Sequence, residues 1–253
     1  MIKTERQFDE YARGNGMVGA AQPTDWRAAA LSACSSCAVR AQGICSAVRP
    51  KVHGHATSRP RQTIYRANEP LNGVRMICEG WAFSFTLLPD GRRHIISFLL
   101  PGDLVSVRSV LQDRLPFSVH TLTEVRHCSF ERAELIAAMR EKPDVFQQFS
   151  DLCVAELESA NQLATDMGRR SAEQRLARLI LGLKARLTSR NLVRDQSFEF
   201  PLRQQHMADA IGVTSVHVSR MITTLHDAGV IDLRNRRLKI LRQAELERIA
   251  NAR

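Results

Sequence analysis

The 253-residue sequence lacks an apolar run long enough to span a membrane. The best apolar stretch, His94 to Leu100, is short and ends at Pro101. The amino-terminal stretch MIKTERQFDEYARG carries charges with no apolar segment behind them, so we do not expect a secretory signal. These absences predict a cytoplasmic protein without a membrane partner, in a compartment where thiols stay reduced.

The motifs of common enzyme classes are also missing. The sequence contains no glycine-rich phosphate loop, no nucleophile elbow and no close pair of carboxylates in a recognisable acid–base setting. We therefore expect a protein that is not an enzyme. An apolar content of 44% and a charged content of 25% are those of a globular protein with one large or two ordinary domains.

Negative charge is scarce in one part of the chain. Residues 169–253 hold 17 Lys and Arg against 8 Asp and Glu, whereas residues 1–168 hold 19 against 18. The last third therefore carries nearly all of the net charge of +10. This asymmetry indicates a polyanion-binding module attached to a neutral remainder.

Three of the six cysteines lie within the twelve residues CSSCAVRAQGIC, at Cys34, Cys37 and Cys45. In a reducing compartment such a group binds metal more often than it forms disulfides. Cys78 and Cys153 fall in apolar segments, where we expect buried side chains rather than ligands.

The chain divides into four parts. Residues 1–62 contain the cysteine group and show little periodicity, which predicts loops and at most a short helix. Residues 63–143 contain short alternating apolar runs broken by glycine turns, as in an antiparallel barrel or jelly roll. Residues 144–168 have the period of a long amphipathic helix, and residues 169–253 form the basic domain. The predicted fold class is α+β.

Strands are expected in VRMIC, WAFSFTLL, HIISFLL and FSVHTLTEV, and a short helix over residues 131–140. The long helix, from about Asp144 to Met167, ends in small residues at Ala160 and Ala164. Small side chains allow close packing against a second copy, so we expect a homodimer.

Residues 201–240 carry the most specific motif, which reads as helix, tight turn, helix and hairpin. Gly212 provides the turn and Thr214 caps the second helix, whose apolar positions face inward. Its outward row can enter the major groove of DNA, with an arginine placed to bind guanine. The residues expected to contact DNA here are Thr214, Ser215, Val216, His217, Ser219 and Arg220, with Ser219 and Arg220 reading bases.

The hairpin IDLRNRRLKI follows the second helix and is expected to form a wing that holds phosphates. Its predicted contact residues are Arg234, Arg236 and Arg237. The alternative is an unrelated pair of packed helices with a solvated basic face.

This order of segments resembles the Crp/Fnr superfamily of bacterial transcription regulators, over nearly the whole chain. LLPGDLV resembles a turn of the family's β-roll, AEQRLARLILGL its helix leading into the DNA-binding domain, and IGVTSVHVSRMI its recognition helix. The resemblance implies an amino-terminal β-roll (jelly-roll) sensor domain, a long dimerisation helix and a carboxy-terminal winged helix-turn-helix domain. It also implies binding of a dimer to near-palindromic double-stranded DNA, and contact with RNA polymerase.

The resemblance extends to the oxygen-sensing, Fnr-like branch. The spacing of Cys34, Cys37 and Cys45 matches that branch, and Cys128 occupies the place of its fourth cysteine, at the end of the β-roll. The implied cofactor is a [4Fe–4S] cluster on these four thiolates, labile to oxygen or nitric oxide.

Two other sensor chemistries remain open at this point. Cys34, Cys37, Cys45 and His53 could form a Cys3His zinc site, and the same cysteines could form a thiol–disulfide switch. Haem is less well supported, since nothing singles out an axial pair among His94, His120 and His127. From another class, the chain could be a metal-dependent scaffold whose basic domain binds RNA or acidic proteins.

The sequence departs from the family in three places. Val216 stands where the recognition helix usually has Glu, which predicts a different half-site. Residues 102–120 lack the arrangement of a Glu and an Arg-Ser pair that binds a cyclic nucleotide in relatives, so none is expected. The segment from Cys45 to the β-roll is short and proline-rich where relatives carry a helix.

Overall fold

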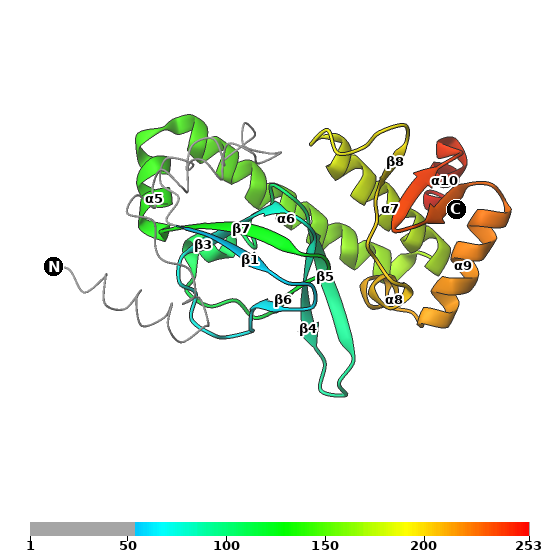
Figure 1. Ribbon diagram of the computed structural model, residues 1–253, viewed down its shortest axis with the longest axis horizontal. Helices are drawn as coiled ribbons and strands as arrows, with labels where there is room; N and C mark the ends of the chain where they lie inside the picture. Colours follow the sequence, from blue (N-terminus) through cyan, green and yellow to red (C-terminus); the bar gives the residue numbers. More distant parts are fainter. Residues whose placement is uncertain (1–53, 253) are drawn as a thin grey trace.

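The computed structural model describes residues 54–252, which form a β-rich domain and a mainly helical domain connected by one long helix (Figure 1). The β-rich domain occupies the blue-to-green side of the figure and the helical domain the yellow-to-red side. The elements of the first domain are β1 (Gly54–Ser58), β2 (Thr63–Tyr65), β3 (Val74–Glu79), β4 (Ala82–Leu87), β5 (Arg93–Leu99), α4 (Arg108–Leu111), β6 (Ser118–Thr121), β7 (Val125–Phe130) and α5 (Arg132–Glu141).

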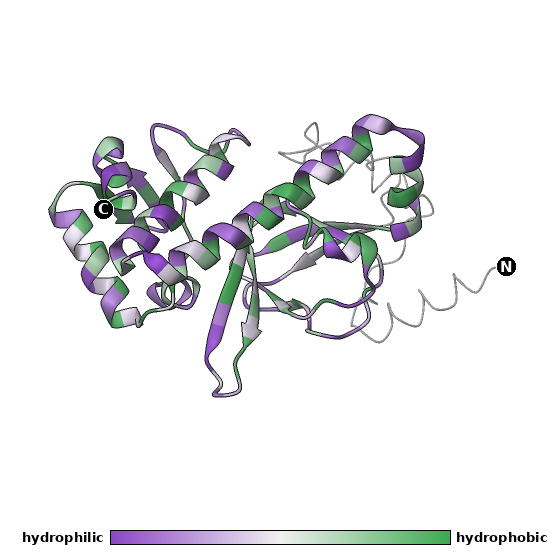
Figure 2. Ribbon diagram, turned by 180° about the vertical axis from the view of Figure 1, so that it is seen from behind, coloured by the Kyte–Doolittle hydropathy of each residue, from purple (hydrophilic) through white to green (hydrophobic). Residues whose placement is uncertain are grey.

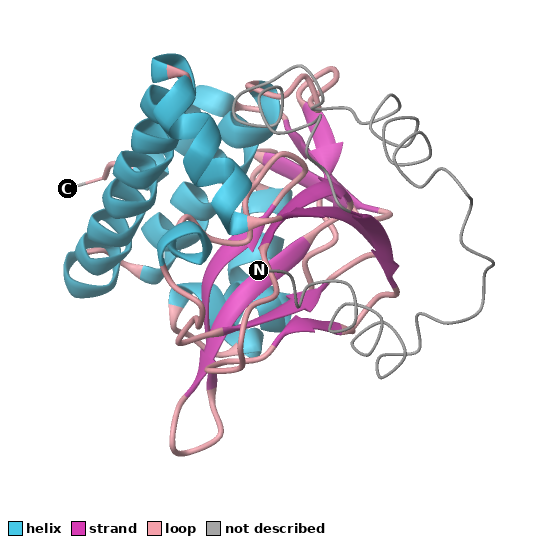
Figure 3. Cartoon of the chain, turned by 90° about the vertical axis from the view of Figure 1, so that its left-hand side faces the viewer, coloured by secondary structure: helices cyan, strands magenta, loops and turns pink. Residues whose placement is uncertain are grey.

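The strands form two antiparallel sheets that face each other, with orders β1-β7-β3 and β2-β6-β4-β5. Figure 3 shows the strands curving around a common interior. That interior is apolar and includes Ile77, Val119 and Val125, each 0% exposed. The jelly-roll architecture predicted for this segment is therefore confirmed.

Glycines close the turns where the sequence predicts them. Gly80, Gly91 and Gly102 all have positive φ, between 79° and 95°. A side chain at Gly80 would also strike the carbonyl oxygen of Glu124, 2.0 Å from the position of its Cβ. The turn after β3 therefore requires glycine both for its backbone conformation and for space.

The sheet differs from the sequence prediction in two places. It begins at Gly54, before the predicted start at residue 63, because GHATS forms an edge strand that pairs with β7 without an apolar run of its own. The stretch FSVHTLTEV is two strands rather than one, since β6 ends at Thr121 and β7 begins at Val125. The break between the two strands is stabilised by Trp81, whose backbone carbonyl accepts hydrogen bonds from the N–H groups of Leu122 and Thr123.

Helix α6 (Pro143–Arg169) runs from the β-rich domain to the helical domain (Figure 1). Its first turns pack on the sheet through Val145 and Phe149, in an apolar cluster that also contains Cys128. The single apolar stripe predicted for this helix is in fact two. One stripe packs on its own β-roll, and the other, including Phe146 and Leu157, is exposed at 58% and 61%. In Figure 2 apolar residues are visible along this helix as well as beneath it.

The helical domain begins with a well-capped helix. Ser171 accepts a hydrogen bond from the backbone N–H of Gln174, and Gln174 accepts one from that of Ser171. A three-stranded sheet with order β8-β10-β9 completes the domain, and its strand β8 was not predicted. The elements are α7 (Ala172–Thr188), β8 (Ser197–Glu199), α8 (Gln204–Ile211), α9 (Ser215–Asp227), β9 (Ile231–Arg234), β10 (Arg237–Ile240) and α10 (Gln243–Ala250).

The two domains share one apolar cluster, which contains Phe83 and Phe98 of the β-roll together with Leu183 and Ile211 of the helical domain. Ion pairs border it. Arg93 on β5 binds Asp209 on α8 at 2.6 Å, and Asp103 in the turn after β5 binds Arg186 of α7 and Arg190 in the turn that follows α7.

His206 of α8 is enclosed at this interface. Its ring lies 5.6 Å from that of Phe83, and its Nδ1 accepts a hydrogen bond from the backbone N–H of Arg203. Burial, and then the nearby guanidiniums of Arg93 and Arg203, lower the pKa of His206 to about 4. The neutral ring is therefore part of the packing between the domains.

Among the helices of residues 54–252, none is both long and apolar enough to cross a membrane.

Candidate nucleic-acid interface and cysteine site

A tight left-handed turn joins α8 to α9. Gly212 adopts φ 70° and ψ 44°, which favours glycine, and its N–H bonds the carbonyl of Ala208. A Cβ at this position would lie 2.5 Å from Cε of Met167, in the last turns of α6. The turn between the two helices is therefore in direct contact with the long connecting helix.

Helix α9 is amphipathic in the way that the sequence predicts. Val218, Met221 and Leu225 are buried against the domain core. Thr214 caps the helix by accepting a hydrogen bond from the N–H of His217 at 3.2 Å. The opposite face is exposed and includes Val216, at 60%, and Arg220. An exposed polar row on a capped helix is suited to the major groove, where base edges present donors and acceptors.

Ser219 is partly buried and has a partner that the sequence does not reveal. The Nε2 of Gln204, at the start of α8, donates a hydrogen bond to its hydroxyl at 3.1 Å. This bond links the first helix of the motif to the second. Fifteen positions separate the two residues, so no local pattern could have identified the contact.

The wing is a two-residue hairpin between β9 and β10. Asn235 and Arg236 both have positive φ, of 52° and 57°, as in the turns that suit the twist of paired strands. Arg234 and Arg237 lie directly opposite each other, so two guanidiniums share the end of the hairpin. Arg234 is held by Asp232 at 2.9 Å, whereas Arg236 projects at the tip. Such a concentration of positive charge favours phosphate.

The structure thus brings all nine predicted DNA-contacting residues into one domain, where they lie on α9, at its cap and on the wing. They are Thr214, Ser215, Val216, His217, Ser219, Arg220, Arg234, Arg236 and Arg237. Glu173, at the start of α7, lies near His217 of α9. The pKa of Glu173 is lowered chiefly by its own backbone N–H, and further by Ser171 and His217.

Of the four predicted cluster ligands, only Cys128 falls within the described residues, and Cys34, Cys37 and Cys45 lie outside them. Cys128 is a free thiol on β7, 1% exposed, in the apolar cluster beneath α5 and α6. Cys78 belongs to the same cluster and Cys153 packs against it, as expected for cysteines that serve as apolar residues. Within residues 54–252 no three His, Cys, Asp or Glu side chains gather as a metal site.

The surroundings of Cys128 include one residue that sequence reasoning missed. His55 on β1 lies directly opposite Cys128, and directly opposite residues of an antiparallel pair face the same side of the sheet. Burial, and then Arg126, lower the pKa of His55. Strand β1 also brings the chain from the cysteine segment to this place, since Gly54 pairs with Ser129 next to Cys128.

Two family models match the chain, one for each domain. The cyclic nucleotide-binding domain matches residues 57–142, and the Crp-like helix-turn-helix domain matches residues 174–249. The β-roll and the winged domain therefore define a class of protein in which a sensory module is attached to a DNA-binding module.

Whole-chain comparisons identify the family within this class. The nitrogen fixation regulation protein FixK of Bradyrhizobium diazoefficiens is 30% identical over 226 residues, which cover 87% of this chain and 94% of FixK. The transcriptional activatory protein AadR of Rhodopseudomonas palustris is 32% identical over 202 residues, covering 77% and 83%. The transcriptional activator FnrL of Cereibacter sphaeroides is 26% identical, covering 82% and 87%. The chain belongs to the Crp/Fnr family of transcription regulators, which are not enzymes.

The fold agrees with this assignment. The structure of FixK2 from Bradyrhizobium japonicum superimposes with a TM-score of 0.71 at 24% identity, over 79% of this chain and 98% of FixK2. The TTHB099 regulator of Thermus thermophilus superimposes with a TM-score of 0.61 at 22% identity.

Proposed function

We propose that this protein is a homodimeric transcription regulator that reads a near-palindromic DNA site with α9. Its affinity for that site changes when a [4Fe–4S] cluster is lost. The DNA-binding part depends on one observation above all. The exposed face of α9, the wing arginines and the glycine turn lie together in the domain that holds nearly all of the net positive charge.

Helix α6 supports the homodimer. Its exposed stripe advances in alternating steps of four and three residues, which is the spacing of a coiled-coil seam. The stripe contains the exposed Phe146, Leu157, Ala160 and Ala164, together with the partly buried Ser150 and Cys153. A second copy of the helix would cover these side chains and place two recognition helices on half-sites about 34 Å apart.

Two features support Cys128 as a ligand. It is a free thiol, and its apolar neighbours would shield a bound cluster from water. Nine steps separate Cys45 from Gly54, which pairs with Ser129 next to Cys128, and a chain of that length spans at most about 30 Å. Cys34, Cys37, Cys45 and Cys128 would supply four thiolates, and a bound cluster would supply a group labile to oxygen or nitric oxide.

Anaerobic purification followed by iron and sulfide analysis tests the cofactor. We expect about four irons per subunit, and loss of that iron in Cys128→Ala. Cys153→Ala is the matched control, because Cys153 packs against the same apolar cluster and is not a proposed ligand. A colourless protein that contains zinc would contradict the proposal and favour the Cys3His site with His53. A protein without metal that forms disulfides would favour the thiol switch.

The interior of the β-roll supports the absence of a cyclic nucleotide. After the Pro101-Gly102-Asp103 turn, the residues facing inward are apolar, among them Val105 and Leu115, both buried. The hydroxyl of Tyr65 accepts the N–H of Leu115 at 2.7 Å. Because residues 102–120 contain no Glu to bind the ribose, we expect cyclic AMP to leave the melting temperature unchanged, and a saturable shift would contradict this.

We also propose that RNA polymerase contacts the β-roll around residues 106–116. This loop projects Arg108 and Leu111, the latter 70% exposed. Leu111→Asp tests the contact: we expect it to lose transcription activation and to keep its DNA binding.

In the scaffold alternative, the basic domain binds RNA or acidic proteins. That alternative requires that binding to a specific duplex does not survive competitor DNA.

A further inference from the structure

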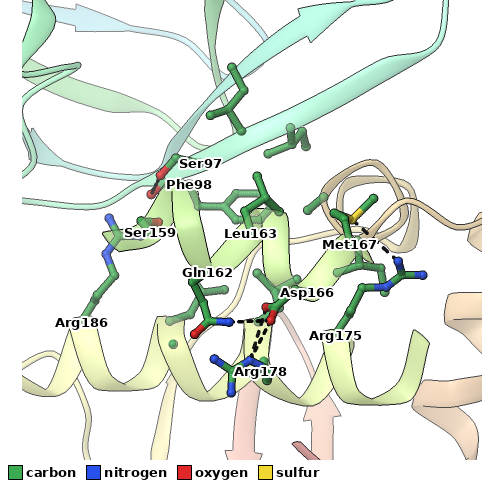
Figure 4. Close-up of a pocket in the computed structure, with 17 residues that line it drawn as sticks. Ser97, Phe98, Ser159, Gln162, Leu163, Asp166, Met167, Arg175, Arg178 and Arg186 are labelled. Carbon is green, nitrogen blue, oxygen red and sulfur yellow. Dashed lines mark hydrogen bonds and ion pairs between the residues drawn. The ribbon is translucent and has the colours of Figure 1, made fainter. Parts of the chain in front are cut away.

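A cavity of about 260 Å³ lies where the β-roll, the connecting helix and the helical domain meet. Strand β5 forms one wall, α6 a second, and α7 with the end of α8 the rest (Figure 4). Ligand pockets for drug-sized molecules begin near 300 Å³, so an occupant of this cavity would be small. The cavity is separate from the face of α9 and from Cys128.

The walls are mainly apolar. Ile95, Phe98, Leu183 and Ile211 line it and are each at most 4% exposed overall. On α7 the wall is open at Gly182, where an added Cβ would meet no atom within 4 Å. A flat apolar body therefore has room between β5 and α7.

The charged part of the lining is mainly cationic. Three arginines of α7 contribute to it, against one carboxylate, Asp166. Arg178 is paired with Asp166 at 3.1 Å, and Arg186 is paired with Asp103. Two of the three guanidiniums therefore already have carboxylate partners.

Arg175 differs from the other two. Its Nη1 lies 3.8 Å from the sulfur of Met167, a weak acceptor. Its buried Nε has no hydrogen-bond partner within the described part of the chain. Figure 4 shows this guanidinium directed at Met167 on the edge of the cavity. A guanidinium without an oxygen partner beside an apolar cavity is matched by a carboxylate, which it can bind through two parallel hydrogen bonds.

We propose that this cavity binds a small organic carboxylate with a flat apolar body, and that Arg175 holds the carboxylate. One available guanidinium fits a single negative charge better than a doubly charged phosphate. The walls come from both domains and from α6, so an occupied cavity stabilises this particular arrangement of the domains. The consequence for DNA rests on the proposed function: occupancy changes the affinity of the full-length dimer for its site.

Calorimetric titration of the full-length protein with 2-naphthoate tests the site. We expect saturable binding of one molecule per subunit, and at least tenfold weaker binding of the neutral analogue 2-naphthamide. Arg175→Gln should weaken the binding of 2-naphthoate at least tenfold. Gly182→Leu should abolish it, because the new side chain fills the cavity.

Arg169→Gln is the matched control. It makes the same substitution at an exposed arginine that does not line the cavity, so the variant should fold and bind as the parent does. Circular dichroism checks the fold of each variant, and Arg175→Gln keeps the test decisive if Gly182→Leu does not fold. Unchanged affinity in Arg175→Gln, equal binding of the amide, or no saturable binding by the parent would each overturn the proposal. This titration contains no DNA, so its failure is distinct from failure of the proposed function.

Discussion

Gly80 and Gly91 have nearly the same backbone conformation in different surroundings. Their φ values are 79° and 81°. A Cβ at Gly80 would lie within 3.0 Å of the backbone of Glu124, whereas a Cβ at Gly91 would meet nothing within 4 Å. The pair therefore separates the cost of a left-handed conformation from the cost of a steric clash.

We expect Gly80→Ala to lower the free energy of unfolding by about 3 kcal/mol or more, because strain and overlap add. Gly91→Ala should cost about 1 kcal/mol, from the backbone conformation alone. Urea denaturation of the two variants measures the difference. Equal losses would show that the loop carrying Glu124 moves aside.

Arg220 and Arg236 are both exposed, and we expect them to contribute differently to DNA binding. Arg220→Ala should cost roughly 1–3 kcal/mol on the specific site and relax the preference at one base position. Arg236→Ala should weaken binding to specific and random DNA alike and reduce its salt dependence, because a wing arginine binds phosphate. Binding assays at several salt concentrations distinguish the two, and equal loss on both DNAs in Arg220→Ala would contradict base reading.

Val216 leads to a prediction about the half-site itself. Its side chain is 60% exposed on the first turn of α9 and offers only apolar contact to a base. Selection of binding sites from random DNA should therefore recover a half-site that differs from the common Fnr sequence. Recovery of the common sequence would refute this.

At the scale of elements, α6 has two apolar faces with different tasks. Val145 and Phe149 pack on the β-roll, whereas Leu157 on the other stripe is 61% exposed. A single chain leaves the second face in water, which is unfavourable for so many apolar side chains on one helix.

We expect Leu157→Lys to convert the dimer to a monomer at micromolar concentration and to abolish binding to the palindromic site. Glu158→Lys places the same side chain one position away, outside the stripe, and should leave the dimer intact. Analytical ultracentrifugation of both variants provides the measurement. A dimeric Leu157→Lys would place the interface elsewhere.

At the scale of the whole molecule, the contact between the domains contains a titratable ring. His206 lies against Phe83 and near Arg93, and its pKa is lowered to about 4. Between pH 6.5 and 4 the unfolded chain binds this proton more readily than the folded protein does. The stability that the neutral ring provides is therefore complete above about pH 6.5 and is lost as the pH falls towards 4.

We expect the free energy of unfolding to fall as the pH is lowered through this window. His206→Gln should flatten that dependence, because an amide can accept the same backbone hydrogen bond without titrating. His127, whose pKa burial also lowers to about 4, contributes a remaining slope. Denaturant unfolding at intervals of pH tests this, and an unchanged slope in the variant would exclude His206 as a contributor.

Patterns among residues close in sequence were sufficient to predict much of the fold. The motif around Gly212, the cap at Thr214 and the wing follow from residues close in sequence, where glycine, capping and charge each have a local physical cause. The strands β3, β4 and β5 were predicted from alternation and turns. Strand β1 was missed because an edge strand needs no apolar run.

Other features exist only through contacts between distant segments. The bond from Gln204 to Ser219, the position of His55 opposite Cys128 and the division of α6 into two faces depend on what packs against each element. The sequence by itself indicated the two modules and the surface predicted to face DNA, since these rest on local periodicity and charge, and it indicated the family through the resemblance of its segments to those of known members. Only the tertiary structure decided how the β-roll packs against the helical domain and that Arg175 lines a cavity. Burial and pairing depend on which surfaces come together on folding, and those surfaces belong to segments distant in sequence.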